Sequence, residues 1–271
     1  MTRHAREMLF YSDNTAPVHP KVMEAIRAAD AVDFAYDADA LSQALDARFS
    51  EWFEREVAVI WMSTGTAANA LALALYCPPY GGILTHDNAH VVVDECGAVE
   101  LQTGGARLLG CPASGGTLNP SALRTRIDSL GKGVHHTRPF AVSLTNATEY
   151  GRVYTRAQLE DIGALCRTEG LALHVDGARF ANGAMNAEAV ILFDSARADE
   201  ARRRRKRAGH LLSKGRYIAA QLHAMLEDDL WLANARKANA AAAALVPAAG
   251  DRLLHTVEAN ELFLSLSADE M

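Results

Sequence analysis

Short apolar runs alternate with amphipathic stretches along residues 19–194. The runs cover residues 57–65, 81–86, 107–112, 140–148, 171–176 and 187–194, and all but the second end at Gly, Thr, Asp or Pro, as buried strands often do. The stretches with helical spacing cover residues 19–29, 39–54, 66–77, 119–130 and 155–170. Apolar strands that alternate with amphipathic helices predict an α/β fold with a mostly parallel sheet covered by helices.

The pattern changes after Asp194. Residues 194–230 carry a long helical pattern, and residues 234–245 carry another. Residues 251–267 place apolar side chains at every second position, which predicts strands. We therefore predict a large domain over residues 1–228 and a smaller α+β domain over residues 229–271.

The composition is that of an ordinary globular protein, since 271 residues, 49% of them hydrophobic, can bury a large core. The formal net charge of -6 argues against a nucleic-acid partner. We interpret the basic run at residues 202–207 as a solvated or intersubunit helix face, with phosphate binding as the alternative. No apolar run approaches the ~20 residues of a membrane span. Residues 1–10 lack a signal-peptide core, and the four cysteines have no metal-binding spacing, so we expect a cytoplasmic protein.

Three polar clusters follow predicted strands, at the carboxyl ends where parallel sheets gather their active sites. The first cluster, residues 63–69, is a Gly-containing turn before a helix. The backbone N–H groups of this turn and the hydroxyl of Thr66 suit a phosphate. The alternative is a plain N-capping turn, because Ser and Thr are favoured there without any ligand.

The second cluster, residues 86–90, carries two histidines four residues apart. On a helix, His86 and His90 would share one face and could bind zinc, as in a metal-binding hydrolase. The sequence offers no convincing third ligand, so we predict no metal. We interpret His90 as an imidazole stacked on a flat ligand, or as a plain loop histidine.

The third cluster is formed by Asp176 and Arg179. Asp176 ends an apolar strand, where a carboxylate costs several kcal/mol unless it is paired. Arg179 could supply the counter-charge. In the functional interpretation, Asp176 instead pairs with a protonated pyridine nitrogen and keeps that ring cationic.

Together, these clusters resemble a known family. The chain is similar to the low-specificity threonine aldolases and phenylserine aldolases, within the aromatic-amino-acid β-eliminating lyase group of pyridoxal-phosphate (PLP) enzymes. The similarity runs from residues 10–26 to residues 257–263. It implies an aspartate-aminotransferase-like fold (PLP fold type I), PLP as the cofactor, and a homodimer or homotetramer.

The resemblance also implies roles for the polar clusters. Gly65 and Thr66 would hold the cofactor phosphate, and His90 would stack on the pyridine ring. Asp176 would hold the ring nitrogen. Arg179 would contact the phenolic oxygen of the ring or the substrate.

The implied reaction cleaves a β-hydroxy-α-amino acid, of the threonine or phenylserine type, to glycine and an aldehyde. Ser12 would lie at the substrate carboxylate, and a base must remove the β-hydroxyl proton. In many threonine aldolases the stretch that matches residues 144–148 ends in a histidine close to the substrate hydroxyl. Here it ends in Thr148, which is no base near pH 7, so His90, a water or another residue must take the proton.

The Schiff-base lysine of the family has no counterpart in this chain. In the family it precedes Asn-Gly-Ala, and residues 182–184 have that sequence but join directly to residues 178–181. Lys206 and Lys214 lie in a helical pattern and match no position of the motif. We expect a helix and a strand, roughly 25 residues, to be absent at this place. The prediction is a chain that cannot bind its cofactor covalently and is inactive as an aldolase.

Two interpretations of this gap stay open. The chain is either an aldolase that lacks a segment or a catalytically dead remnant that retains the fold and binds PLP weakly or not at all. The family also continues, past the stretch that matches residues 263–271, to an arginine that binds the substrate carboxylate. We therefore expect the smaller domain to be incomplete.

Overall fold

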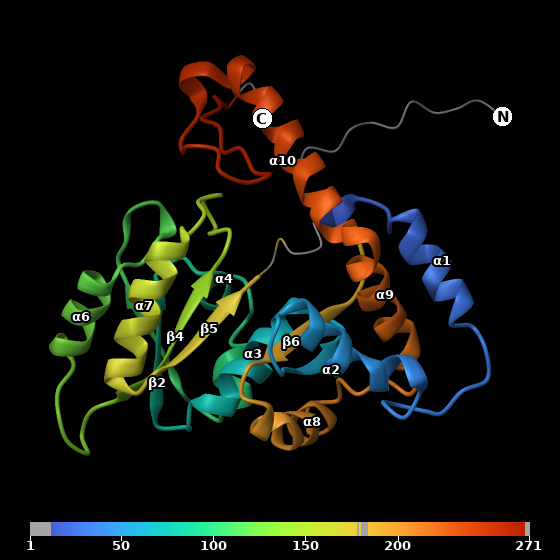
Figure 1. Ribbon diagram of the computed structural model, residues 1–271. Helices are drawn as coiled ribbons and strands as arrows, with labels where there is room; N and C mark the ends of the chain where they lie inside the picture. The colour runs from blue at the N-terminus through green and yellow to red at the C-terminus, as the bar shows by residue number, and fades with distance from the viewer. Residues whose placement is uncertain (1–11, 178, 180–183, 269–271) are drawn as a thin grey trace.

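The computed structural model describes residues 12–177, 179 and 184–268. Its centre is a four-stranded sheet in the order β3-β2-β4-β5, and every neighbouring pair in it is parallel. The strands are β2 (Gly81–His86), β3 (Arg107–Cys111), β4 (Arg138–Thr145) and β5 (Ala172–Asp176). The predicted parallel α/β architecture is confirmed, and Figure 1 shows β2, β4 and β5 running side by side.

Two further strands form a separate sheet. β1 (Ala58–Met62) pairs antiparallel with β6 (Glu188–Leu192), so Met62 lies opposite Glu188. β5 and β6 each keep one edge that no described residue pairs with. On β5, the side chains of Leu173 and Val175 are 39% and 43% exposed, which is unusual for a strand of a parallel sheet.

Helices cover both sheets. The first five are α1 (Pro20–Ala28), α2 (Ala40–Trp52), α3 (Gly65–Tyr76), α4 (His90–Val93) and α5 (Ala98–Thr103). The other five are α6 (Pro120–Ser129), α7 (Arg156–Glu169), α8 (Ala198–Arg207), α9 (Arg216–Leu226) and α10 (Leu230–Ala249). The short helices α4 and α5 were not predicted, because neither is long enough to show a helical period.

Helix α3 joins the two sheets. Ala and Leu fill most of its positions, and residues 67–75 are all buried, so the helix can pack on every side. Ala67 and Leu71 pack with the apolar side chains of β1 and β6. Ala70 and Leu73 pack with the side chain of Ile83 in β2. The first turn of α3 is therefore held between the two sheets (Figure 1).

The long helical pattern after Asp194 is interrupted. α8 ends at Arg207, a loop over residues 208–215 follows, and α9 begins at Arg216. Gly209 in this loop has φ +82°, a left-handed conformation that ends a helix and that glycine adopts without strain. The prediction that Lys214 lies in a helix is therefore wrong, whereas Lys206 does lie in α8.

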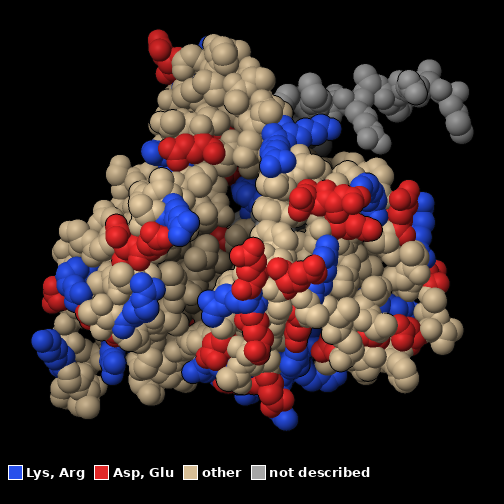
Figure 2. Space-filling view, in the orientation of Figure 1, with Lys and Arg blue, Asp and Glu red and all other residues tan. Residues whose placement is uncertain are grey.

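The basic run of α8 is paired with acidic side chains. Arg202, Arg203, Arg204 and Arg205 each form an ion pair with an aspartate or a glutamate. Figure 2 shows basic and acidic side chains interspersed over the face in view. These pairs favour the interpretation of the run as a structural helix face over phosphate binding.

The C-terminal part differs from the prediction. α10 rises out of the main body, and residues 251–267 fold back beside its end (Figure 1). The described part of this segment contains no strand, and its one bridge joins Leu253 to Leu264. The predicted strands are wrong because two short strands without a neighbouring sheet have too little to pack against. The domain boundary at residues 228/229 stays a prediction.

Candidate active site

The first turn of α3 carries the predicted phosphate site. Thr64 is the N-cap of α3, and its hydroxyl accepts the backbone N–H of Ala67 at 3.2 Å. Gly65 and Thr66 follow as the first helical residues, whose N–H groups have no acceptor inside the helix. A Cβ placed on Gly65 would meet no atom within 4 Å, so the space beside this turn is open. The capping turn and an anion site are therefore compatible.

His86 and His90 do not share a helix. His86 ends β2, while His90 begins α4 after a turn. Both ring nitrogens of His86 are used, because Nδ1 accepts the N–H of Asn88 at 3.2 Å and Nε2 donates to the carbonyl of Ala113 at 3.3 Å. The described residues contain no group of three His, Cys, Asp or Glu side chains that could hold a metal ion. The geometry behind the zinc alternative is therefore wrong.

His90 is fixed by a buried carboxylate. Its Nδ1 lies 2.9 Å from Oε1 of Glu95, and its backbone N–H donates to Glu149 at 2.8 Å. The side chain of Glu95 is fully buried, whereas that of His90 is 48% exposed. The hydrogen bond to Glu95 raises the pKa of His90 and outweighs the opposing effect of burial; the charges of Glu95, Asp176 and Asp94 act in the same direction as the hydrogen bond. His90 therefore presents a ring that is anchored on one edge and open on the other.

Asn69 connects this pair to Asp176. Its amide nitrogen donates to Oε1 of Glu95 at 2.8 Å and to Oδ2 of Asp176 at 2.7 Å. Asp176 ends β5, and Asn69 lies about one turn along α3 from Gly65 and Thr66. One buried amide therefore links the first turn of the helix with two carboxylates and, through Glu95, with His90.

The predicted counter-charge of Asp176 has another partner. Arg179 donates a hydrogen bond to Glu261, which belongs to the C-terminal segment. Burial alone would lower the pKa of Arg179, but Glu261, Asp13 and Asp176 outweigh it and raise the pKa. Arg179 thus lies within electrostatic range of Asp176 without being its hydrogen-bond partner.

Ser12 caps the short 3-10 helix η1 (Asp13–Thr15), and its hydroxyl accepts the N–H of Asn14 at 3.2 Å. The charge of its neighbour Asp13 contributes to the raised pKa of Arg179, so this segment lies within electrostatic range of Arg179. The role of Ser12 at a substrate carboxylate stays a prediction.

Thr148 is a structural residue. Its hydroxyl accepts the backbone N–H groups of Arg152 and Tyr150, at 3.2 and 3.3 Å, and donates to the carbonyl of Gly115 at 3.3 Å. The side chain is buried. A hydroxyl committed to three backbone groups orders the turn and is not available as a base.

Sequence reasoning missed Asn69 and Glu95 as site residues. Asn69 ends the first polar cluster, residues 63–69, and its spacing of three residues from Thr66 places both on one face of a helix, which could have indicated its role. Glu95 follows an apolar run and has no motif, so only the fold reveals that it lies behind His90.

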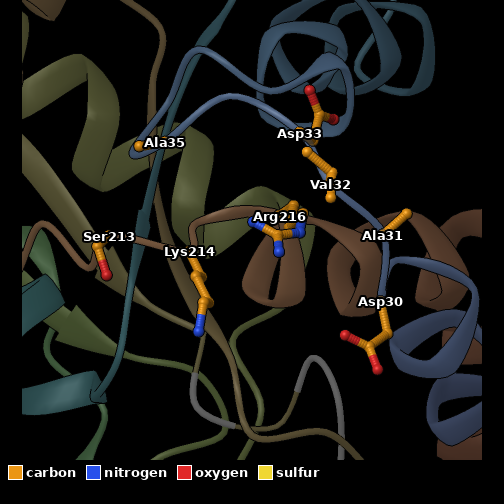
Figure 3. Close-up of a pocket in the computed structure, with 8 residues that line it drawn as sticks. All are labelled: Asp30, Ala31, Val32, Asp33, Ala35, Ser213, Lys214 and Arg216. Atoms are coloured by element: carbon orange, nitrogen blue, oxygen red, sulfur yellow. The ribbon is translucent and has the colours of Figure 1, made fainter.

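The chain has five lysines, all in the described part: Lys21, Lys132, Lys206, Lys214 and Lys237. The ammonium group of Lys206 lies over the ring of Tyr36, 4.9 Å from its centroid. Lys214 lines a separate groove together with residues 30–33 and 35 (Figure 3). No lysine forms a hydrogen bond or ion pair with the His90–Asp176 cluster among the described residues. Of the Asn-Gly-Ala sequence at residues 182–184, the first two lie outside the described residues.

Comparison with known proteins gives the family. The family model for β-eliminating lyases matches residues 10–188. A low-specificity L-threonine aldolase of Pseudomonas aeruginosa is 35% identical over 300 aligned positions, covering 98% of this chain and 86% of the relative. Since the chain has only 271 residues, that relative has positions without a counterpart here. A second such aldolase, from a Pseudomonas species, is 34% identical over 95% of this chain and 84% of its own length.

The solved structures confirm the fold. A threonine aldolase of Leishmania major superposes with a TM-score of 0.86 at 26% identity, covering 93% of this chain and 83% of the other. An aspartate aminotransferase of Rhodobacter sphaeroides has a TM-score of 0.64 at 11% identity, which shows the fold alone. The predicted aspartate-aminotransferase-like fold and family resemblance are thus confirmed. The chain belongs to the β-eliminating lyase family and to its threonine aldolases, which are PLP-dependent carbon–carbon lyases.

Proposed function

We propose that this chain binds PLP beside the first turn of α3, with its ring between His90 and Asp176. The observation that carries the proposal is the pair of hydrogen bonds from Asn69, which fixes Asp176 relative to the helix that would hold the phosphate. The open space at Gly65 leaves room for phosphate oxygens near the free N–H groups of that turn. The donors and acceptors of the cluster therefore fit the phosphate and the ring of PLP.

The residues of the site suit the reaction of the family, whose proposed substrate is a β-hydroxy-α-amino acid of the threonine or phenylserine type. When bound, PLP supplies a cationic ring that takes up the electron pair released as the Cα–Cβ bond breaks. Asp176 would keep the proton on the ring nitrogen, because a nearby carboxylate stabilises the charged form. Nε2 of His90 is the nitrogen that Glu95 does not use, and it would exchange a proton with the substrate hydroxyl.

Arg179 and Ser12 are the proposed residues for the substrate carboxylate. Arg179 is already hydrogen-bonded to Glu261, so a substrate carboxylate would have to replace that side chain. Such an exchange of one carboxylate for another keeps the guanidinium paired throughout.

Without a lysine amine in the cluster, the proposed binding is non-covalent and the chain has no aldolase activity of its own. This follows because no lysine of the described residues forms a hydrogen bond or ion pair with the cluster: Lys206 lies over the ring of Tyr36, and Lys214 lines a separate groove. The proposal separates two properties of the family, cofactor binding and catalysis, and assigns only the first to this chain.

Equilibrium dialysis with PLP tests binding. We expect saturable binding to the wild-type chain and weaker binding to Asp176→Ala, because the ring nitrogen loses its counter-charge. Equal affinity of the two proteins, or no binding by either, would contradict the proposed site. Borohydride reduction of the PLP-loaded chain, followed by peptide mapping, tests the non-covalent mode. A reduced pyridoxyl group on Lys206 or Lys214 would refute that mode.

The quaternary structure and the cellular location belong to the same proposal. We propose a homodimer or homotetramer in the cytoplasm, where the four free thiols would stay reduced. Among residues 12–177, 179 and 184–268, no helix is long and apolar enough to cross a membrane. Light scattering on the purified chain measures the oligomeric state, and a monomer at all concentrations would contradict this part.

A further inference from the structure

Glu95 is a buried carboxylate with an unusual set of contacts. Its side chain is fully buried, in the turn between α4 and α5. Oε1 receives hydrogen bonds from Nδ1 of His90 and from the amide of Asn69. Oε2 is buried and has no hydrogen-bond partner in the described structure. A carboxylate so far from water requires a positive charge nearby.

His90 is the base that can supply this charge. Among the described residues, no lysine or arginine forms an ion pair with Glu95, whereas the imidazole of His90 lies 2.9 Å away. The other charged or titratable groups that act on His90 are Asp94 and Asp176, together with Glu149, which accepts its backbone N–H. All of these groups are acidic, so each favours the protonated ring.

The contact with Glu95 also fixes the orientation of His90. With Nδ1 turned inward, the opposite edge of the ring, which carries Nε2, is directed away from Glu95, and the ring remains 48% exposed. Glu95 acts on Asp176 as well, because both carboxylates accept from the same amide nitrogen of Asn69. A change at Glu95 therefore reaches both residues that would contact the cofactor ring.

We propose that Glu95 is a positioning residue that fixes the orientation of the His90 imidazole and strengthens its affinity for a proton, with one ring face presented to the cofactor, and that fixes Asp176 through Asn69. The inference rests on the proposed PLP site for its functional meaning. The hydrogen-bonded arrangement itself does not depend on that site.

The test is Glu95→Gln, which keeps the size and shape of the side chain and removes its charge. NMR titration of the imidazole C–H signals measures the pKa of His90, whose resonance is assigned by its loss in His90→Asn. We expect the pKa of His90 to fall by about 1 to 3, because an opposite charge in contact is lost. We also expect the dissociation constant for PLP to rise roughly tenfold or more. Glu160→Gln is the matched control, since Glu160 lies on the exposed face of α7 and pairs with Arg156.

The outcomes separate the inference from the function. An unchanged pKa of His90 in Glu95→Gln overturns the positioning role, even when PLP binds. A fallen pKa in a protein that binds no PLP in any form supports the arrangement and refutes the proposed function. Should Glu95→Gln not fold, Glu95→Asp decides the question, because it keeps the charge but withdraws it from Nδ1. In Glu95→Asp, a fall of the His90 pKa smaller than that expected for Glu95→Gln supports the inference, and no fall overturns it.

Discussion

The amide nitrogen of Asn69 donates to both Glu95 and Asp176, and Asn69→Asp is the change that tests this arrangement. The substitution keeps the shape of the side chain and exchanges a hydrogen-bond donor for an acceptor. The new oxygen would lie 2.8 Å from an oxygen of Glu95 and 2.7 Å from one of Asp176. Asn69 and Glu95 are buried, so water cannot screen the contact between them.

The expected loss of stability follows from two competing costs. At an effective dielectric constant of about 20, each carboxylate contact costs about 6 kcal/mol if the new group is ionised. Protonation of an acid with a pKa of about 3.9 costs about 4 kcal/mol at pH 7, so the group takes up a proton instead. The protonated acid can donate to only one of its two neighbours, which adds roughly 1.5 to 3 kcal/mol. We therefore expect Asn69→Asp to lower the free energy of unfolding by about 5 to 7 kcal/mol at pH 7.

This loss depends on pH with a definite sign. The new carboxyl group has a higher pKa in the folded chain than in the unfolded chain, so the folded chain binds more protons between about pH 4 and its folded pKa. Stability therefore falls by about 1.4 kcal/mol for each pH unit of increase in that range. Asn69→Ala, the control, removes both hydrogen bonds without adding a charge and should cost about 2 to 4 kcal/mol at every pH.

Urea unfolding, followed by tryptophan fluorescence at pH 5, 6, 7 and 8, measures both variants. The difference between Asn69→Asp and Asn69→Ala should widen as the pH rises. A difference that stays constant over this range would show that the new group is not held between two carboxylates. The arrangement of Glu95, Asn69 and Asp176 would then be wrong.

Three further predictions concern other parts of the molecule. Arg205 is buried between an ion-pair partner and the ring of Trp61, so Arg205→Met should lower the free energy of unfolding by about 2 to 4 kcal/mol, and an unchanged urea midpoint would contradict this. Cys96 is the one exposed thiol of the four, and burial raises the pKa of the other three to about 11, so a thiol reagent at pH 8 should modify one cysteine in the folded chain and four after unfolding. The hydrogen bonds from the Arg152 side chain and from a backbone N–H lower the pKa of Glu258 in the folded chain. The ionised side chain therefore stabilises the fold above about pH 4.3, and this stabilisation is lost as the pH falls through the pKa of the folded chain. The protection of residues 253–264 against hydrogen exchange should fall as the pH is lowered through that interval, and it should also be lower in Arg152→Gln than in the wild type. Constant protection would contradict the contact between Arg152 and Glu258.

The features that the sequence predicts best are those with a local cause. Each apolar run became a strand, and α3 is buried over residues 67–75 because Ala and Leu fill most of its positions. Asp176 was placed correctly at the end of a strand for the same reason. These properties depend on residues that are close along the chain, so the pattern of apolar and polar residues predicts them.

The features that it missed depend on contacts between distant segments. Glu95 and Asp176 share the amide of Asn69 although they lie far apart along the chain. The alternating pattern of residues 251–267 predicts strands only where a sheet is available, and no strand of the described structure lies beside them. The loop that holds Lys214 depends on one glycine in a left-handed conformation.

The free edge of β5 has a consequence for the behaviour of the chain in solution. Its backbone N–H and C=O groups face no strand in the described structure, and Leu173 and Val175 lie on one face of it, partly exposed. Such an edge is a template on which another chain can add a strand, and neither a proline nor a lysine of β5 opposes that addition. Concentrated solutions of the protein are therefore expected to associate through intermolecular β-pairing at this strand, and a single lysine in place of Val175 should keep the chains apart.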